Sequence, residues 1–88
     1  MIHQGPLQCP CCDFFSLEKR ASYDICPVCY WEDDGQDLDA LDVVSGPNHI
    51  TLRAGRESFS RCGASDPAAV SLVLSAAERD GMRREVRA

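Results

Sequence analysis

Four of the six cysteines in this 88-residue chain form two matched pairs. The pairs lie in Cys9-Pro10-Cys11-Cys12 and Cys26-Pro27-Val28-Cys29, two C-P-x-C turns separated by thirteen residues. Two residues between ligands let one tight turn aim both sulfurs at a common point, and proline presets that turn at φ of about −65°. Two such turns supply the four thiolates of a closed tetrahedral zinc site. The spacing therefore predicts one structural Zn²⁺ ion bound by Cys9, Cys12, Cys26 and Cys29.

Three other uses of paired cysteines compete with zinc. A thioredoxin-like redox centre needs one C-x-x-C at a helix start and leaves the second pair unexplained. Disulfides are common in small secreted chains, but no apolar leader with a cleavage site precedes Cys9, which predicts a reducing, cytoplasmic location. Rubredoxin-like iron uses the same four thiolates. We expect a metal rather than disulfides; the spacing leaves zinc and iron open, and zinc is our choice.

The two remaining cysteines are not expected to bind the ion. Cys11 lies at the tip of the first turn and cannot join Cys9 and Cys12 on one ion without strain. Negative charge from the neighbouring thiolates and Asp13 disfavours a reactive thiolate, so we expect a spare thiol in the turn rather than a redox sensor. Cys62 falls on the apolar face of a predicted helix, which favours a small buried hydrophobic residue.

The two histidines are also expected to lie outside the metal site, because the cysteine quartet is complete without them. His3 is near the start of the chain and His49 precedes a predicted helix. Each is expected to be exposed or to lie in a capping region. No serine, cysteine or carboxylate stands in a recognisable catalytic spacing with either one, so the chain is predicted not to be an enzyme.

Short elements must position the cysteine turns. Apolar residues between polar turn signals predict strands at residues 5–8, 14–17 and 22–25. Residues 31–47 are acidic and rich in Asp and Gly, without a sustained period, and this predicts a loop. Trp31, directly after the second turn, is expected to pack against the metal turns as the main core anchor rather than to form an exposed hot spot.

Helical periodicity begins after residue 50. A first helix is predicted with Thr51 as its N-cap and Gly63 as its C-terminal stop, because apolar residues then share one face. Asp66 and Pro67 signal the start of a second helix that Gly81 ends or frays. Residues 82–88 are expected to form a mobile basic tail.

The predicted fold class is α+β. We expect one domain over residues 1–88, because a chain of this length has one small core. It comprises a zinc-ribbon-like β-hairpin unit with both cysteine turns (7–31), an acidic loop, two covering helices (51–80) and the tail (81–88). The longest apolar stretch, residues 67–77, is too short to cross a bilayer. No membrane association is expected.

Charge is distributed unevenly within the net −5. Residues 1–50 carry two basic side chains against nine acidic ones, a net −7, whereas residues 51–88 carry seven against five, a net +2. An anionic surface repels phosphate, and nucleic-acid binding depends on cationic contacts. The arginines of the second half alternate with acids, which favours salt bridges within the helices. We expect no nucleic-acid binding, and a protein partner that contacts the acidic segment from Trp31 to Asp42.

Several runs of residues are similar to those of a known family. They are Cys9-Pro10-Cys11-Cys12, residues 23–35 (YDICPVCYWEDDG), Gly46-Pro47-Asn48 and residues 52–65. Over about residues 7–66 the chain resembles the bacterial cysteine-rich CPCC family. The resemblance implies a small zinc-binding domain and supplies no activity.

One element departs from the family pattern. The family's S-L-x-E-A-R reads Thr51-Leu52-Arg53-Ala54-Gly55-Arg56 here. Loss of the Glu removes a capping box, and Gly in place of Ala costs about 1 kcal/mol of helix stability. The departure leaves the metal site intact but affects the role of this helix.

The function predicted from these features is that of a small cytosolic structural-zinc protein that acts as a protein–protein interaction module. The main alternative is a nucleic-acid-binding zinc ribbon, acting through Arg53, Arg56, Arg61 and the C-terminal arginines. Further alternatives are a rubredoxin-like iron electron carrier and a small inhibitor or immunity-type protein.

Overall fold

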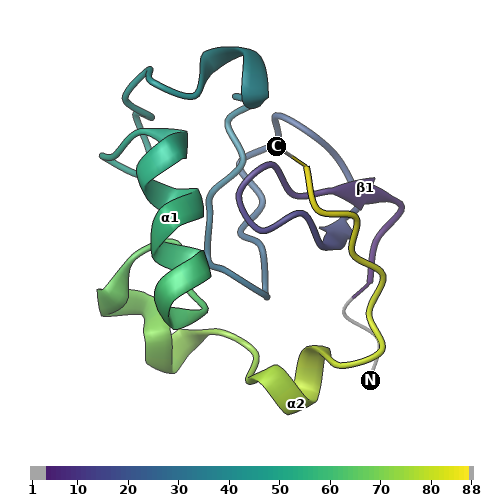
Figure 1. Ribbon diagram of the computed structural model, residues 1–88. Helices are drawn as coiled ribbons and strands as arrows, with labels where there is room; N and C mark the ends of the chain where they lie inside the picture. The colour runs from purple at the N-terminus through teal and green to yellow at the C-terminus, as the bar shows by residue number, and fades with distance from the viewer. Residues whose placement is uncertain (1–3, 88) are drawn as a thin grey trace.

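The two predicted N-terminal strands form an antiparallel hairpin in the computed structural model, which describes residues 4–87 (Figure 1). Strand β1 (Leu7–Gln8) pairs with β2 (Phe15–Leu17), with Leu7 opposite Leu17 and Gln8 opposite Phe15. The first cysteine turn is the connection between these strands. With the helices described below, the hairpin makes a small α+β fold, as the sequence predicts.

The predicted strand at residues 22–25 is wrong. Only Ile25 pairs, in an isolated bridge with Glu32, and the Tyr23 N–H donates to the Asp33 carbonyl at 2.8 Å. Ala21 and Tyr23 have φ angles of 60° and 61°, left-handed values that interrupt an extended strand. This segment therefore pairs with the chain just after the second cysteine turn and not with the first hairpin.

Helix α1 (Leu52–Cys62) has the predicted ends. The Thr51 hydroxyl accepts the Ala54 N–H, so the N-cap persists without the family's glutamate. Gly63 closes the helix at φ 83°, in the left-handed conformation that glycine adopts without strain. In Figure 1, α1 stands on one side of the molecule and the hairpin on the other.

Gly55 explains how closely α1 approaches the core. A Cβ atom at this position would lie 2.9 Å from Trp31 Cζ3 and 3.3 Å from Cys11 Sγ. The glycine that departs from the family pattern therefore lets the helix backbone lie directly against Trp31 and the first cysteine turn. This close contact offsets the low helix propensity of glycine.

The second predicted helix is divided into two pieces. A 3₁₀ helix, η2 (Pro67–Leu72), is followed by extended Val73, and α2 (Ala76–Arg79) then begins anew. The Leu74 N–H donates to the Pro27 carbonyl at 3.0 Å, so it cannot continue the preceding helix. Ser75 and Glu78 form a capping box that starts α2. The prediction of one continuous helix is therefore wrong.

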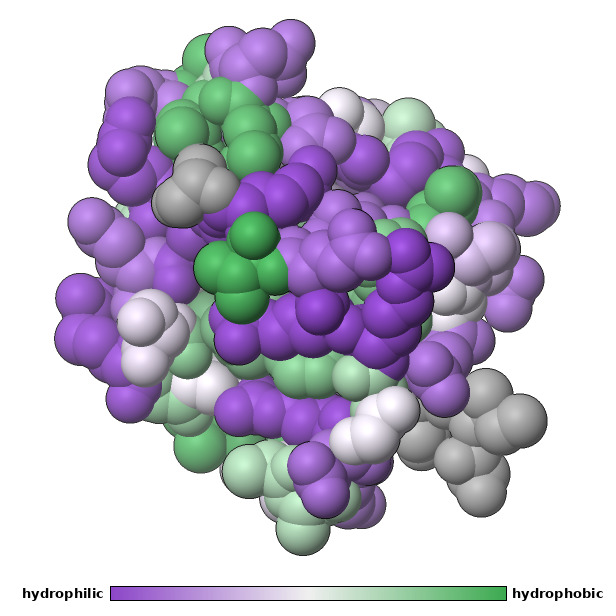
Figure 2. Space-filling view, turned by 45° about the vertical axis from the view of Figure 1, so that its right-hand side comes forward, coloured by the Kyte–Doolittle hydropathy of each residue, from purple (hydrophilic) through white to green (hydrophobic). Residues whose placement is uncertain are grey.

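The prediction of a mobile tail is wrong for residues 82–87. Phe14 forms a bridge with Arg84, and the Phe15 N–H donates to the Arg83 carbonyl at 3.0 Å. The segment thus runs beside the hairpin, as the yellow trace in Figure 1 shows. On this side of the molecule hydrophilic side chains predominate, and hydrophobic ones form only small, separate clusters (Figure 2). The C-terminal segment is therefore part of the fold.

The core lies between α1, the hairpin and the two cysteine turns. Trp31 and Leu52 are fully buried and Leu17 nearly so, which confirms Trp31 as a core anchor. The ring of Phe14 meets that of Phe59 edge to face, with centroids 6.2 Å apart. Between residues 4 and 87 no helix is long and apolar enough to span a bilayer.

Candidate metal centre

The two cysteine turns have the same backbone structure. In the first, the Asp13 N–H donates to the Cys9 carbonyl at 3.0 Å; in the second, the Tyr30 N–H donates to the Cys26 carbonyl at 2.8 Å. The residue after each turn, Asp13 or Tyr30, has a left-handed backbone, with φ of 68° and 72°. Each turn therefore folds back on itself and directs its two sulfurs to the same side.

The four predicted ligands converge. The sulfurs of Cys9, Cys12, Cys26 and Cys29 all lie within 4.8 Å of one another. Cys9 Sγ is 3.7 Å from Cys29 Sγ, and Cys12 Sγ is 3.8 Å from Cys26 Sγ. A tetrahedral ion with metal–sulfur bonds of about 2.3 Å requires sulfurs about 3.8 Å apart. The quartet can thus hold one metal ion, as the spacing predicts.

Burial of the sulfurs makes the quartet dependent on a cation. All four cysteines are between 0% and 1% exposed. Burial raises the pKa of Cys9, Cys12 and Cys29, because a thiolate loses its hydration there. Burial also opposes ionisation of Cys26, but hydrogen bonds from the other cysteines and Ser16 lower its pKa well below the usual value. A divalent cation is what would stabilise all four thiolates together.

Ser16 supports one ligand directly. Its hydroxyl lies 3.0 Å from Cys26 Sγ, and the residue is mostly buried on β2. A hydroxyl donor to a metal-bound thiolate fixes the orientation of that sulfur and reduces its charge. Ser16 is therefore a positioning residue for the second turn.

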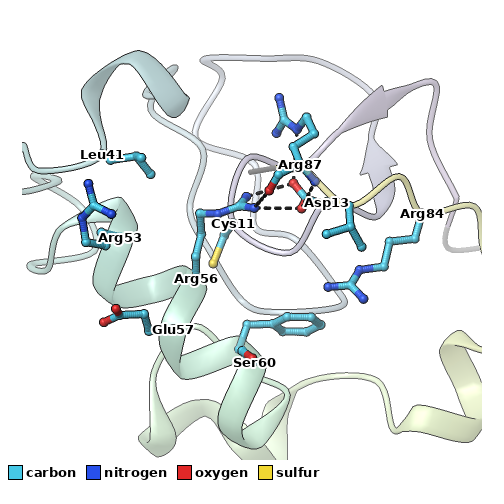
Figure 3. A pocket seen from close by; sticks show the side chains of 11 residues that line it. Cys11, Asp13, Leu41, Arg53, Arg56, Glu57, Ser60, Arg84 and Arg87 are labelled. Carbon is cyan, nitrogen blue, oxygen red and sulfur yellow. Dashed lines mark hydrogen bonds and ion pairs between the residues drawn. The ribbon is translucent and has the colours of Figure 1, made fainter.

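Asp13 anchors the first turn to two distant arginines. Arg56 of α1 donates from both Nη atoms to the carboxylate at 2.9 Å, and Arg87 adds its backbone N–H at 2.8 Å and its Nε at 3.2 Å. Figure 3 shows the two arginines converging on Asp13 from different elements. Burial opposes ionisation of this carboxyl, but the contacts with Arg56 and Arg87 hold its pKa below the usual value. We call this set of three residues the Asp13 clamp.

A pocket of about 340 Å³ borders the Asp13 clamp. Four arginines line it, namely Arg53, Arg56, Arg84 and Arg87. Arg53 pairs with Asp42 at 2.7 Å, and Arg84 donates to the Cys12 carbonyl at 2.9 Å while lying over Phe14 and Phe59. Arg53, Arg56 and Arg87 thus pair with carboxylates of distant segments and not within one helix alone. Arg56, Arg84 and Arg87 connect α1 and the C-terminal segment to the first cysteine turn and Asp13.

The family model of cysteine-rich CPCC proteins matches residues 7–80. The chain belongs to the cysteine-rich CPCC family. The resemblance of its motifs is thereby confirmed, and the matched region contains both turns of this CPCC protein. No curated protein and no solved structure matches the chain.

The other two cysteines of the CPCC protein lie outside the quartet. Cys11 is a spare thiol, as predicted, but it is 2% exposed and packs near Gly55 instead of projecting from the turn. Val28 takes the equivalent place in the second turn and is fully buried. The prediction for Cys62 is wrong: it is exposed at the end of α1, with its Sγ 3.6 Å from the Ser58 hydroxyl.

His49, the one histidine among the described residues, is not part of the quartet. His49 is exposed with φ 64°, in the segment just before Thr51, the N-cap of α1. His3 lies outside the described residues. Within residues 4–87 the quartet is the single group of ligating side chains that could hold a metal.

The acidic segment is less exposed than its composition indicates. Asp33 is fully buried and accepts Arg20 Nε at 2.9 Å, while Asp37 accepts Arg20 Nη1 at 2.8 Å. The contact with Arg20 lowers the pKa of Asp37, although burial alone would raise it. Trp31 is also buried. Trp31 and Asp33 are therefore the buried members of the predicted partner segment, and its other residues are half-buried or exposed.

Sequence reasoning missed Ser16, Asp13, Arg56 and Arg87 as supports of the site. Ser16 had one weak signal, because it is the polar residue between two apolar ones in a predicted strand. Asp13 also had one, since Asp tolerates the left-handed conformation better than most residues. Arg87 had none, because it lies 74 positions from Asp13.

Proposed function

We propose that this CPCC protein is a cytoplasmic zinc-binding protein in which the ion is structural and whose role is to bind another protein. The observation that carries the first part is the burial of a complete quartet. Four thiolates fill the coordination sphere of a tetrahedral ion and leave no open position for a substrate. The ion would then contribute folding free energy.

The burial of the four cysteines also supports zinc rather than iron as the bound metal. Zinc has no redox chemistry and suits a closed four-thiolate shell. An electron carrier benefits from a sulfur near the surface, through which electrons pass to a partner, but these sulfurs are at most 1% exposed.

A protein partner is favoured over nucleic acid by the state of the arginines. Arg53, Arg56 and Arg87 each contact a carboxylate, and Arg83 pairs with Glu85. Binding to phosphates would require these pairs to break or to accommodate a further anion. We also propose that the protein is not an enzyme, because a closed quartet offers neither an activated water nor a Lewis-acid position.

The experiment that tests this function uses the full chain. Elemental analysis and native mass spectrometry should find one zinc ion per chain, and the immobilised zinc-loaded protein should retain a specific protein that Cys26→Ser does not. Iron in the purified protein would contradict the zinc assignment. Binding to DNA or RNA below 1 μM at about 0.15 M salt, where the Debye length is about 8 Å, would contradict the choice of partner.

A further inference from the structure

A second pocket, separate from the Asp13 clamp, lies on the outer side of the second cysteine turn. It has a volume of about 270 Å³. Its apolar lining includes Ile25 and Tyr30, which flank the turn, together with Ile50 and Leu72. We call it the turn groove.

Both walls of the turn groove are attached to the metal-binding segment. The Ser65 N–H donates to the Cys29 carbonyl at 2.7 Å, which holds the wall formed by η2 against the turn. On the other side, Asn48 makes two hydrogen bonds with the backbone of Glu32, at 2.9 and 2.8 Å. The groove therefore depends on the geometry that the metal imposes on the second turn.

The apolar side chains of the groove are exposed without an evident structural reason. Ile25 is 47% exposed, Tyr30 39% and Leu72 59%. Clusters of exposed apolar residues on a small protein mark interaction sites. Tyr30 also holds a left-handed backbone, with φ 72°, where Asn or Asp would be less strained. A strained aromatic residue that contributes little to the core indicates a role at the surface.

The charges at the turn groove have one sign. Glu32 and Asp66 line it, and no lysine or arginine does so among the described residues. Neither carboxylate takes part in a salt bridge within residues 4–87, although Asp66 Oδ1 accepts the Ala68 N–H at 2.9 Å as the N-cap of η2. The pocket beside the Asp13 clamp differs, because its arginines already contact acids and carbonyls of the protein.

We propose that the turn groove binds a segment of the partner protein that carries an apolar side chain next to lysine or arginine. This inference rests on the proposed function and assigns the partner surface within it. The apolar side chain would fill the space between Tyr30 and Leu72, and the basic groups would pair with Glu32 and Asp66. Charge complementarity of this kind selects the partner and speeds its approach.

The test begins with a random dodecapeptide phage library selected on the zinc-loaded full chain. Enriched sequences should carry an aliphatic or aromatic residue flanked by Lys or Arg. A synthetic peptide of the consensus should lose affinity by about tenfold or more on Tyr30→Asn and on Glu32→Lys, since aromatic anchors dominate such contacts. Val86→Ser is the matched control, because Val86 is exposed and lies outside the groove.

Tyr30→Asn keeps the test informative, because asparagine suits the left-handed backbone and leaves the core intact. Acidic or charge-free consensus peptides, unchanged affinity of both groove variants, or no enrichment would each overturn the proposal. So would a dimer, detected by light scattering, that Leu72→Ser dissociates, since the occupant would then be a second copy. If the Tyr30→Asn variant still retains the protein captured by the immobilised chain, the assignment of the turn groove as the partner surface is contradicted. The proposed function of binding another protein is then unaffected.

Discussion

The first cysteine turn, Cys9–Cys12, and the second, Cys26–Cys29, are alike in backbone and different in surroundings. Asp13 follows the first turn and is 1% exposed among arginines, whereas Tyr30 follows the second and is 39% exposed. The residue in the left-handed position is thus buried after the first turn and partly exposed after the second. The difference shows that a shared turn backbone does not fix the role of the residue that follows the turn.

The two turns also differ in what holds them. Arg56, Arg84 and Arg87 all reach the first turn or Asp13 from later in the chain. Among residues 4–87, the second turn receives from other segments the backbone donors of Ser65 and Leu74, besides the Ser16 hydroxyl on its sulfur. We therefore expect mutations around the first turn to affect stability and mutations around the second to affect metal affinity and binding.

The largest expected effect is the loss of metal binding and folding, because both turns supply ligands to the same site. Cys26→Ser should abolish metal binding and unfold residues 7–31, because structural zinc contributes about 10–16 kcal/mol of binding free energy in zinc-finger peptides. Native mass spectrometry gives the metal content, and limited proteolysis with circular dichroism reports the unfolding. Cys62→Ser is the control and should retain one ion, since Cys62 lies outside the quartet. A folded Cys26→Ser protein that still holds the ion would contradict the assignment of both turns to one structural metal site.

The next effect separates the residues that follow the turns. Asp13→Ala should destabilise the zinc-loaded protein by about 3 kcal/mol, because it leaves Arg56 and Arg87 without their buried partner. Tyr30→Asn should change the free energy of unfolding by less than about 1 kcal/mol, as expected for a partly exposed residue. Urea denaturation at constant zinc concentration measures both. Equal effects of the two variants would contradict the difference described here.

Gly55 tests the contact between α1 and the first turn. Gly55→Ala should destabilise the protein by about 1–2 kcal/mol, because the new methyl group would lie 2.9 Å from Trp31 Cζ3 and overpack the core. Helix propensity alone predicts the opposite, a gain of about 1 kcal/mol. The sign of the change in urea midpoint decides between the two. A stabilised variant would mean that α1 can move away from the first turn without cost.

Ser16 provides the smallest and most local test, on the second turn alone. Ser16→Ala should weaken zinc binding by about tenfold, in the range found for groups that orient metal ligands. Competition with a chromogenic chelator measures the change. Ser71→Ala, an exposed serine of η2, should leave the affinity unchanged. Unaltered affinity in Ser16→Ala would show that the Cys26 sulfur needs no support from the hydroxyl.

Much of the site was predictable because its determinants are local. Two cysteines separated by two residues define a turn, and Thr51 and Gly63 mark the ends of α1 through contacts within one helical turn. Trp31 was predictable as a core residue from its place beside the second turn. These features depend on residues close in sequence, for which spacing and residue type are informative.

The remainder depends on contacts between distant segments. The second helix is interrupted because the Leu74 N–H bonds to Pro27, and no periodicity reveals such a partner. Ser75 and Glu78 did carry a capping-box signal for α2. Residues 82–87 resemble a basic tail by composition, but their backbone pairs with Phe14 and Asp13. Cys62 was wrongly predicted to be buried, and the acidic composition around Asp33 did not indicate that this residue is buried, since composition does not say which side of a loop or helix faces inward.

The contact between Asp13 and Arg87 also has a kinetic consequence. A metal held by the quartet would join Cys12 to Cys26 across 14 positions, while the Asp13 clamp joins residues 74 positions apart. Closing the longer loop costs about 1.5 kcal/mol more conformational entropy if it forms independently. Metal capture should therefore precede docking of the C-terminal segment, which then closes a much smaller effective loop. Folding would then start at the thiolates and end with the docking of Arg87, so a contact that the metal never touches would depend on metal capture.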